Sequence, residues 1–346
     1  MSQHPKDASF LIGHQRSLDA IKASLDKPTH SWLFEGRPGI GKATLAYRFI
    51  KYLLAKDDSN KNAETLEVPL ADSVHKMVSG QVHPDLTVVG SDGAMGEISA
   101  DQVRKAMLRI YNRPAVSEFN ILLIDNAEKL NRNSANMLLK TLEEPPGHAV
   151  IILVCNSSNT LPKTIASRCR KVAFSALSQV EVCTILKRLI PGISDEEIAD
   201  LTTVSNGSVG DAMKLCDLGE AAYSGLEAYK SVLKLLGQKA PLDHFLSELF
   251  AQDINAIWPF VRIILPRVFL LPCSWLIGLE QSSIIDVEHV WLKHISQSAS
   301  MQAVVKSYAK AMSIINDTEA LDLDKRASLV MLFAALINLN KSLLTQ

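Results

Sequence analysis

Residues 35–44 read Glu35-Gly36-Arg37-Pro38-Gly39-Ile40-Gly41-Lys42-Ala43-Thr44, between an apolar run at 31–34 and a helical pattern at 45–54. A glycine followed, after four residues, by Gly-Lys is typical of a loop that binds phosphate. Glycines let backbone N–H groups converge on the anion, the following helix N-terminus adds positive potential, and the lysine reaches the β and γ phosphates. Because strand, loop and helix follow in the required order, we predict a nucleotide-binding scaffold rather than a glycine-rich turn without a ligand.

Position 43 departs from this pattern, because it is alanine where such loops carry a Ser or Thr whose hydroxyl binds Mg²⁺. The next residue does not simply replace it, since one helical step turns a side chain by about 100°. We therefore expect a degenerate nucleotide site without a metal ligand. Its loop residues are Gly36, Gly39, Gly41, Lys42 and Thr44.

The composition is that of an ordinary globular protein: 346 residues, 47% apolar and 21% charged, with a formal net charge of −1. This length predicts two or three domains, and the charge argues against a chain that coats nucleic acid over its whole surface. The polar start and the absence of a run of about 18 apolar residues lead us to expect a cytoplasmic protein without membrane contact. Five cysteines without C-x-x-C spacing favour reduced thiols.

Strand and helix patterns alternate over the first half of the chain, which predicts a three-layer α/β domain with a parallel sheet at residues 1–176. Only helical patterns follow. They predict a small three-helix domain at residues 177–219 and a separate helical domain at residues 220–346. The apolar runs that predict buried strands lie at residues 31–34, 85–89, 120–124, 149–154 and 171–174.

Two polar residues follow predicted strands and are expected at the same sheet edge as the loop. Asp125 ends the run at residues 120–124, where a carboxylate could order a metal-bound water; a turn-favouring Asp is the alternative. Asn156 follows the run at residues 149–154, close to where a γ phosphate would lie, and a strand-capping role remains equally open. Asn126 stands where hydrolases of this layout usually carry Glu, and an amide cannot accept a proton.

A basic pattern lies on the helix predicted to begin after Ser99, its expected N-cap. Lys105, Arg109 and Arg113 recur every four residues, which predicts three positive charges on one helical face. Contact with a DNA backbone is one interpretation, and a solvated helix face is the other.

Several strings along the chain form one ordered set of motifs. They are Ile12-Gly13-His14-Gln15, the loop at 36–42, His83-Pro84-Asp85, Ile124-Asp125-Asn126-Ala127-Glu128-Lys129-Leu130, residues 135–146 ending in Leu138-Leu139-Lys140-Thr141-Leu142-Glu143-Glu144-Pro145-Pro146, Leu161-Pro162 and Ser167-Arg168-Cys169. The order of these motifs resembles the AAA+ clamp-loader family, and within it the delta-prime subunits of bacterial DNA polymerase III. The resemblance covers residues 10–215. It implies a P-loop domain followed by a lid, and a collar at residues 220–346 through which subunits oligomerise.

The resemblance implies a five-subunit ring that opens a sliding clamp and closes it on primed DNA. It implies gamma/tau and delta subunits as partners, indirect contact with the clamp, and primed DNA held through the assembly. By the same resemblance Arg168 is an arginine finger that acts in trans on a neighbour's ATP. A surface salt bridge is the alternative role for this residue.

Three departures from the ATP-hydrolysing relatives accompany this resemblance. Those relatives carry Ser or Thr at 43, Glu at 126, and an arginine where this chain has Gly210. We therefore expect a non-hydrolysing stator with no ATPase activity alone, no required cofactor and at most weak binding of ATP or ADP. Relatives also commonly bind zinc through four cysteines after the first helix; this chain has none between residues 55 and 84, so we expect no zinc.

Two other functions stay open at this point. The chain could be an active ATPase of the gamma/tau type, with Thr44 and Glu128 replacing the missing groups. It could also be an AAA+ adaptor outside replication, whose residues 220–346 bind another partner. ATP hydrolysis by the isolated chain and co-purification with polymerase III subunits discriminate these functions.

Overall fold

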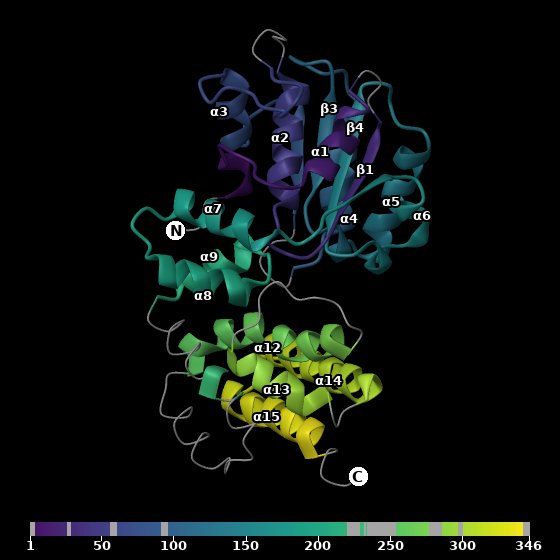
Figure 1. The fold of residues 1–346 in the computed structure, drawn as a ribbon. Helices are drawn as coiled ribbons and strands as arrows, with labels where there is room; N and C mark the ends of the chain where they lie inside the picture. The colour runs from purple at the N-terminus through teal and green to yellow at the C-terminus, as the bar shows by residue number, and fades with distance from the viewer. Residues whose placement is uncertain are drawn as a thin grey trace. The chain divides into compact units, whose positions relative to one another are not determined.

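The computed structural model describes residues 4–25, 29–55, 61–90, 96–219, 229–231, 233, 254–276, 286–296 and 300–341. The chain divides into two compact units, Ser2–Leu177 and Ser178–Gln346 (Figure 1). The division lies one residue from the predicted end of the α/β domain. The further boundary at residue 219 stays a prediction, and most of residues 220–253 lie outside the described residues.

The first unit is built on one five-stranded sheet with the order β2-β3-β4-β1-β5, and every pair of neighbours is parallel. Each strand rests on an apolar run that the sequence identifies, so the predicted α/β class is confirmed. The strands are β1 (Ser31–Glu35), β2 (Leu86–Val89), β3 (Asn120–Ile124), β4 (Ala149–Cys155) and β5 (Arg170–Ala173).

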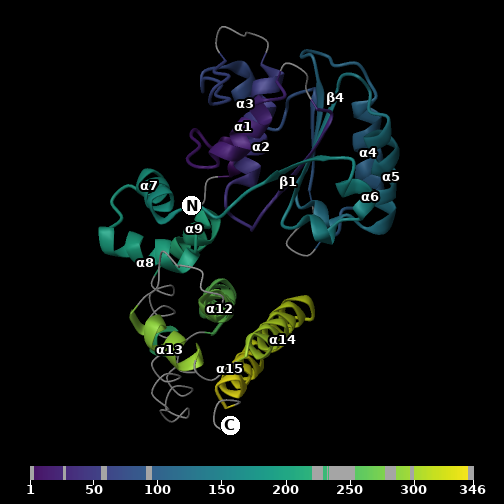
Figure 2. The ribbon, with the colours of Figure 1, turned by 45° about the vertical axis from the view of Figure 1, so that its right-hand side comes forward.

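Helices cover both faces of the sheet, because successive side chains of each strand point to opposite sides. Trp32 and Phe34 pack into the core formed with α1, α2 and α3, whereas Leu33 packs into the core formed with α4, α5 and α6. Figure 2 shows the two helical layers on either side of the sheet. The helices are α1 (Gln15–Lys22), α2 (Lys42–Leu54), α3 (Ser73–Ser79), α4 (Ala100–Ile110), α5 (Arg132–Glu143) and α6 (Lys163–Ala166).

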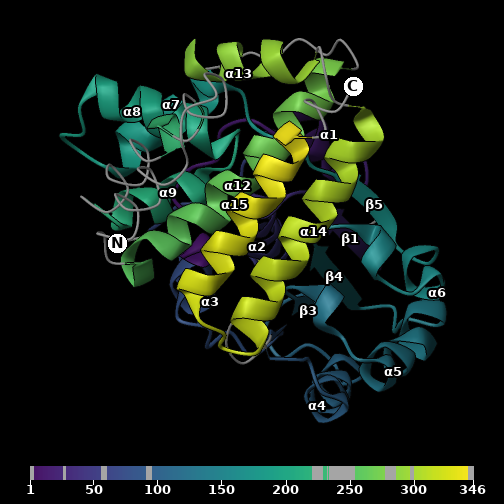
Figure 3. The same cartoon turned by 90° about the horizontal axis from the view of Figure 1, so that it is seen from below.

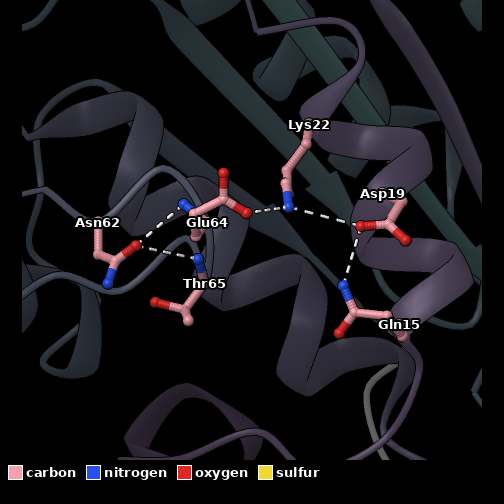
Figure 4. Close-up of polar contacts among 6 residues, drawn as sticks. All are labelled: Gln15, Asp19, Lys22, Asn62, Glu64 and Thr65. Carbon is pink, nitrogen blue, oxygen red and sulfur yellow. Dashed lines mark hydrogen bonds and ion pairs between the residues drawn. The ribbon is translucent and has the colours of Figure 1, made fainter.

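Polar side chains hold the segment after α2 in place (Figure 4). Asn62 Oδ1 accepts hydrogen bonds from the N–H groups of Glu64 and Thr65 at 2.9 and 3.2 Å, which closes a tight turn. Lys22 on α1 joins Glu64 at 2.5 Å and Asp19 at 3.5 Å. The turn is therefore attached to α1, while the absence of zinc remains a prediction.

The second unit is helical throughout its described part. Three short helices come first: α7 (Gln179–Leu189), α8 (Asp195–Ser205) and α9 (Val209–Asp217). Ser178 and Ser194 begin α7 and α8 with reciprocal capping boxes, in agreement with the Ser-x-x-Glu spacing in the sequence. The longer helices are α12 (Ile254–Leu276), α13 (Asp286–Ser296), α14 (Met301–Ala320) and α15 (Lys325–Lys341).

These two sets of helices share one apolar core. Val204 on α8 and Leu215 on α9 are buried in the same cluster as Trp258 and Phe260 on α12. Figure 3 shows α12, α14 and α15 running next to one another, and their contacts agree. Across the described residues, no helix is both long and apolar enough to cross a bilayer.

Candidate functional site

The loop between β1 and α2 has a backbone that only glycine adopts readily. Gly36, Gly39 and Gly41 have φ angles of 154°, 73° and 108°. A Cβ atom on Gly36 would lie 2.6 Å from the carbonyl oxygen of Phe174. His14 Nε2 lies 2.6 Å from the Ile40 carbonyl oxygen. Since the first-turn N–H groups of α2 have no partner within the helix, this loop has the geometry of an anion site.

Lys42 points back into its own loop. Its ammonium donates to the carbonyl oxygens of Gly36 at 2.6 Å and Arg37 at 2.7 Å, and to Asn156 Oδ1 at 3.2 Å. An ammonium has three protons, so these contacts use all of its donors. Burial lowers the pKa of Lys42, while the nearby Glu128, Cys155 and Asp125 raise it. A phosphate group would reach this lysine only by displacing one of its present acceptors.

The end of β3 supplies the acidic groups. Asp125 Oδ1 accepts the Asn126 N–H at 3.0 Å; burial raises the pKa of Asp125, against the effects of that N–H and of Lys42. Asn126 has a left-handed backbone with φ 57°, a conformation that Asn tolerates well. Glu128 Oε1 accepts a hydrogen bond from Asn156 Nδ2. The structure thus links Lys42, Asn156 and Glu128 by hydrogen bonds, with Asp125 as an electrostatic neighbour.

The other predicted loop residue does not join this cluster. Among the described residues, no hydrogen bond connects Thr44 to Lys42, Asn156 or Glu128. Ala43 has no side-chain oxygen. The residues present therefore fit a phosphate group, with three glycines and a lysine, but do not fit a Mg²⁺ ion held by the loop hydroxyl.

Arg168 lies elsewhere on the first unit, between α6 and β5. Its Nη2 contacts Glu143 Oε1 at 2.6 Å and its Nη1 donates to the Thr164 carbonyl oxygen at 2.9 Å. The Arg168 side chain is 35% exposed, so the guanidinium is at the surface but fixed by α5 and α6. No local pattern in the sequence indicates Glu143 as this partner, although Glu143 belongs to the Leu-Glu-Glu-Pro-Pro string that carries the resemblance.

The prediction that three basic residues share one helical face is wrong for one of them. Lys105 and Arg109 are exposed on α4, which begins with the expected Ser99 capping box. Arg113 lies beyond the end of this helix at Ile110, so it does not share their face. The reason is Pro114, because a residue before proline is disfavoured in the α region. Contact of all three residues with DNA stays a prediction.

Comparisons with known proteins agree with these features. A family model described as DNA polymerase III, delta subunit, matches residues 14–178. The subunit gamma of Buchnera aphidicola subsp. Schizaphis graminum is 28% identical over 312 residues, which cover 88% of this chain and 80% of that protein. Residues 14–178 belong to the AAA+ clamp-loader family. The residues that the family model matches include the loop, Asp125, Asn156 and Arg168.

Proteins named as different subunits of DNA polymerase III are similar to this chain. The subunit delta' of Pseudomonas aeruginosa is 29% identical over 250 residues, covering 72% of this chain and 71% of that protein. The chain covers only 36% of the subunit tau proteins of Salmonella typhimurium and Escherichia coli. A gamma subunit-related protein of Thermotoga maritima superposes with a TM-score of 0.40 at 15% identity, covering 92% of this chain and 97% of that one.

Proposed function

We propose that this protein is the delta-prime-type subunit of a DNA polymerase III clamp loader. In this proposal it is a stator that does not hydrolyse ATP and lends Arg168 to the ATP site of a neighbouring subunit during clamp loading. Its partners are the gamma/tau and delta subunits directly, and the sliding clamp and primed DNA through the assembly. Alone it has no catalytic activity, although the assembly serves a DNA-directed DNA polymerase.

One observation carries the proposal: the ammonium group of Lys42 is enclosed by its own chain, whereas the guanidinium group of Arg168 lies at the surface. All three donors of Lys42 are taken by its own loop and Asn156, whereas Arg168 is held at the surface by Glu143 and Thr164. The residue types point the same way. Ala43 offers no hydroxyl to a metal ion and Asn126 offers no base to a water, while a guanidinium remains to stabilise phosphate charge elsewhere.

The proposal is tested in a clamp loader reconstituted with gamma/tau and delta subunits, the clamp and primed DNA. The isolated chain should show no ATP hydrolysis in a single-turnover assay. Arg168→Ala should lower turnover at the ATP site it serves by about 10³-fold, the scale of an arginine supplied in trans. Size-exclusion chromatography should show that the ring still assembles.

Arg104→Ala is the matched control, since Arg104 also forms a surface ion pair, with Asp101 on the same helix. This variant should leave turnover unchanged. Full turnover by the Arg168→Ala assembly would contradict the proposed role of Arg168.

An active ATPase of the gamma/tau type is the second candidate. The contact between Glu128 and Asn156, next to Lys42, favours it, because a carboxylate in this place could serve as a base. Brisk hydrolysis by the isolated chain with magnesium would select this candidate, provided that Glu128→Gln abolishes the activity.

A further inference from the structure

We propose that the carboxylate of Glu128 takes the place of a nucleotide phosphate beside Lys42, so that the loop is occluded by a residue of its own chain. The inference deepens the proposed function, on which it rests in taking the loop as non-hydrolysing. Glu128 then sets nucleotide affinity instead of serving as a base.

The contacts form a continuous path from cation to anion. Asn156 receives a hydrogen bond from Lys42 on its amide oxygen and donates one to Glu128 Oε1 from its amide nitrogen. Both ends of the Asn156 amide are thus used, which fixes its orientation. The side chain expected near a γ phosphate is therefore engaged with a carboxylate of the same chain.

The second oxygen of Glu128 provides independent support. Glu128 Oε2 is buried and has no hydrogen-bond partner among the described residues. A buried carboxylate oxygen without a donor is unfavourable unless a positive charge compensates it. Lys42 is the cation that Glu128 affects here: among the charged neighbours that raise the pKa of Lys42, Glu128 has the largest effect, ahead of Asp125.

The backbone keeps Glu128 in this place. Glu128 lies in the short turn η3 (Ala127–Lys129), directly after β3 and the left-handed Asn126. The N–H of Ile98 donates to the Lys129 carbonyl oxygen at 2.9 Å, and Ala127 is fully buried in the core. Because the turn is anchored on both sides of Glu128, its carboxylate is directed toward the loop by the fold.

Occlusion follows from charge. A nucleotide brings phosphate oxygens to a loop where the half-buried carboxylate of Glu128 is already linked to Lys42 through Asn156. Like charges in a partly buried site repel each other. Binding therefore requires either that Glu128 is displaced or that its charge is removed.

The test measures the binding of fluorescently labelled ADP to the full chain, with native ADP as competitor. Glu128→Gln keeps the shape of the side chain and removes its charge, so it should bind at least about tenfold more tightly than the native chain. Adding Lys42→Met to this variant should abolish the gain. Glu128→Asp, which retains the charge, should show no such gain, and thermal unfolding should show that each variant is folded.

Glu118→Gln is the control, because Glu118 is exposed on the loop before β3. It should leave affinity unchanged. Equal or weaker binding by Glu128→Gln would overturn the inference, as would a gain that survives Lys42→Met. ATP hydrolysis by the native chain would instead refute the proposed stator function, but it would not change the ratio of ADP affinities between Glu128→Gln and the native chain. Failure of the stator function and failure of this inference are therefore distinguishable.

Discussion

Lys42 and Arg168 are both cations that could meet a phosphate, but their surroundings differ. Lys42 is 6% exposed and donates only to groups of its own domain. Arg168 is partly exposed and bound to one carboxylate and one carbonyl, which leaves further guanidinium donors. The chain thus keeps one cation within its own contacts and presents the other outward.

The largest effect is expected when the loop that encloses Lys42 is strained. Gly36→Ala puts a Cβ atom 2.6 Å from the Phe174 carbonyl oxygen in a backbone with φ 154°. We expect it to lower the free energy of unfolding by about 3 kcal/mol, measured by chemical denaturation. Gly147→Ala, with no atom within 4 Å of its Cβ, is the control and should change stability by under about 0.5 kcal/mol. An equal loss in both variants would show that the loop backbone is not constrained.

A second buried lysine on α2 sharpens the comparison, because Lys51 has fewer opposing charges than Lys42. It donates to the Lys6 carbonyl oxygen at 2.6 Å and to His75 Nε2 at 2.9 Å. Burial lowers its pKa from 10.5 to about 8; Asp7 opposes this and Arg48 adds to it. Between pH 8 and 10.5 the unfolded chain binds more protons at this position than the folded chain, so stability rises with pH in this window.

We expect a rise in the free energy of unfolding of about 2 kcal/mol across that window, measured by urea denaturation at several pH values. Below pH 8 the Lys51 side chain is charged in the folded protein as well, so the burial of this charge lowers stability by its full amount. Lys51→Met should flatten the profile there. A native profile that falls or stays flat, or a variant profile with the same slope, would contradict the shift.

A smaller effect should follow when the support of Arg168 is weakened. Glu143→Gln removes the charge that orients the guanidinium, so turnover of the reconstituted assembly should fall by about tenfold while the ring still forms. Glu144→Gln is the matched control, since Glu144 is exposed and makes no ion pair within the described residues. Higher turnover in Glu143→Gln would mean that the carboxylate competes with phosphate for Arg168.

The smallest effect is expected from the removal of Lys42, the enclosed cation. Lys42→Ala should leave turnover of the assembly within about twofold of native, because a site that performs no chemistry contributes nothing to the rate. ATP hydrolysis by the reconstituted loader measures it, with ring assembly checked as before. A loss comparable to that of Arg168→Ala would show that this loop does take part in turnover.

Much of the fold follows from local pattern. Strand β3 begins and ends at the residues that its apolar run predicts, and helix α2 ends at Leu54, the last residue of its helical pattern. The irregular segment after α2 is less predictable, because α3 depends on burying Val74 and Val78 against the sheet's helical layer rather than on a strong local signal. Arg113 shows the opposite case: the charge spacing of four residues predicts that the helix continues to this residue, but Pro114 follows it and α4 ends at Ile110.

The amino-acid sequence by itself determined the residue types: glycines at the loop, Ala43, Asn126 and Gly210, and the strings that resemble those of the clamp-loader family. These are local properties, and periodicity and backbone preference are sufficient to interpret them. Only the tertiary structure decided that Lys42 meets Asn156 and Glu128, and that Arg168 meets Glu143. Such contacts join residues far apart in the chain, so they depend on how the parallel strands align and on which side chains the packed core leaves within reach.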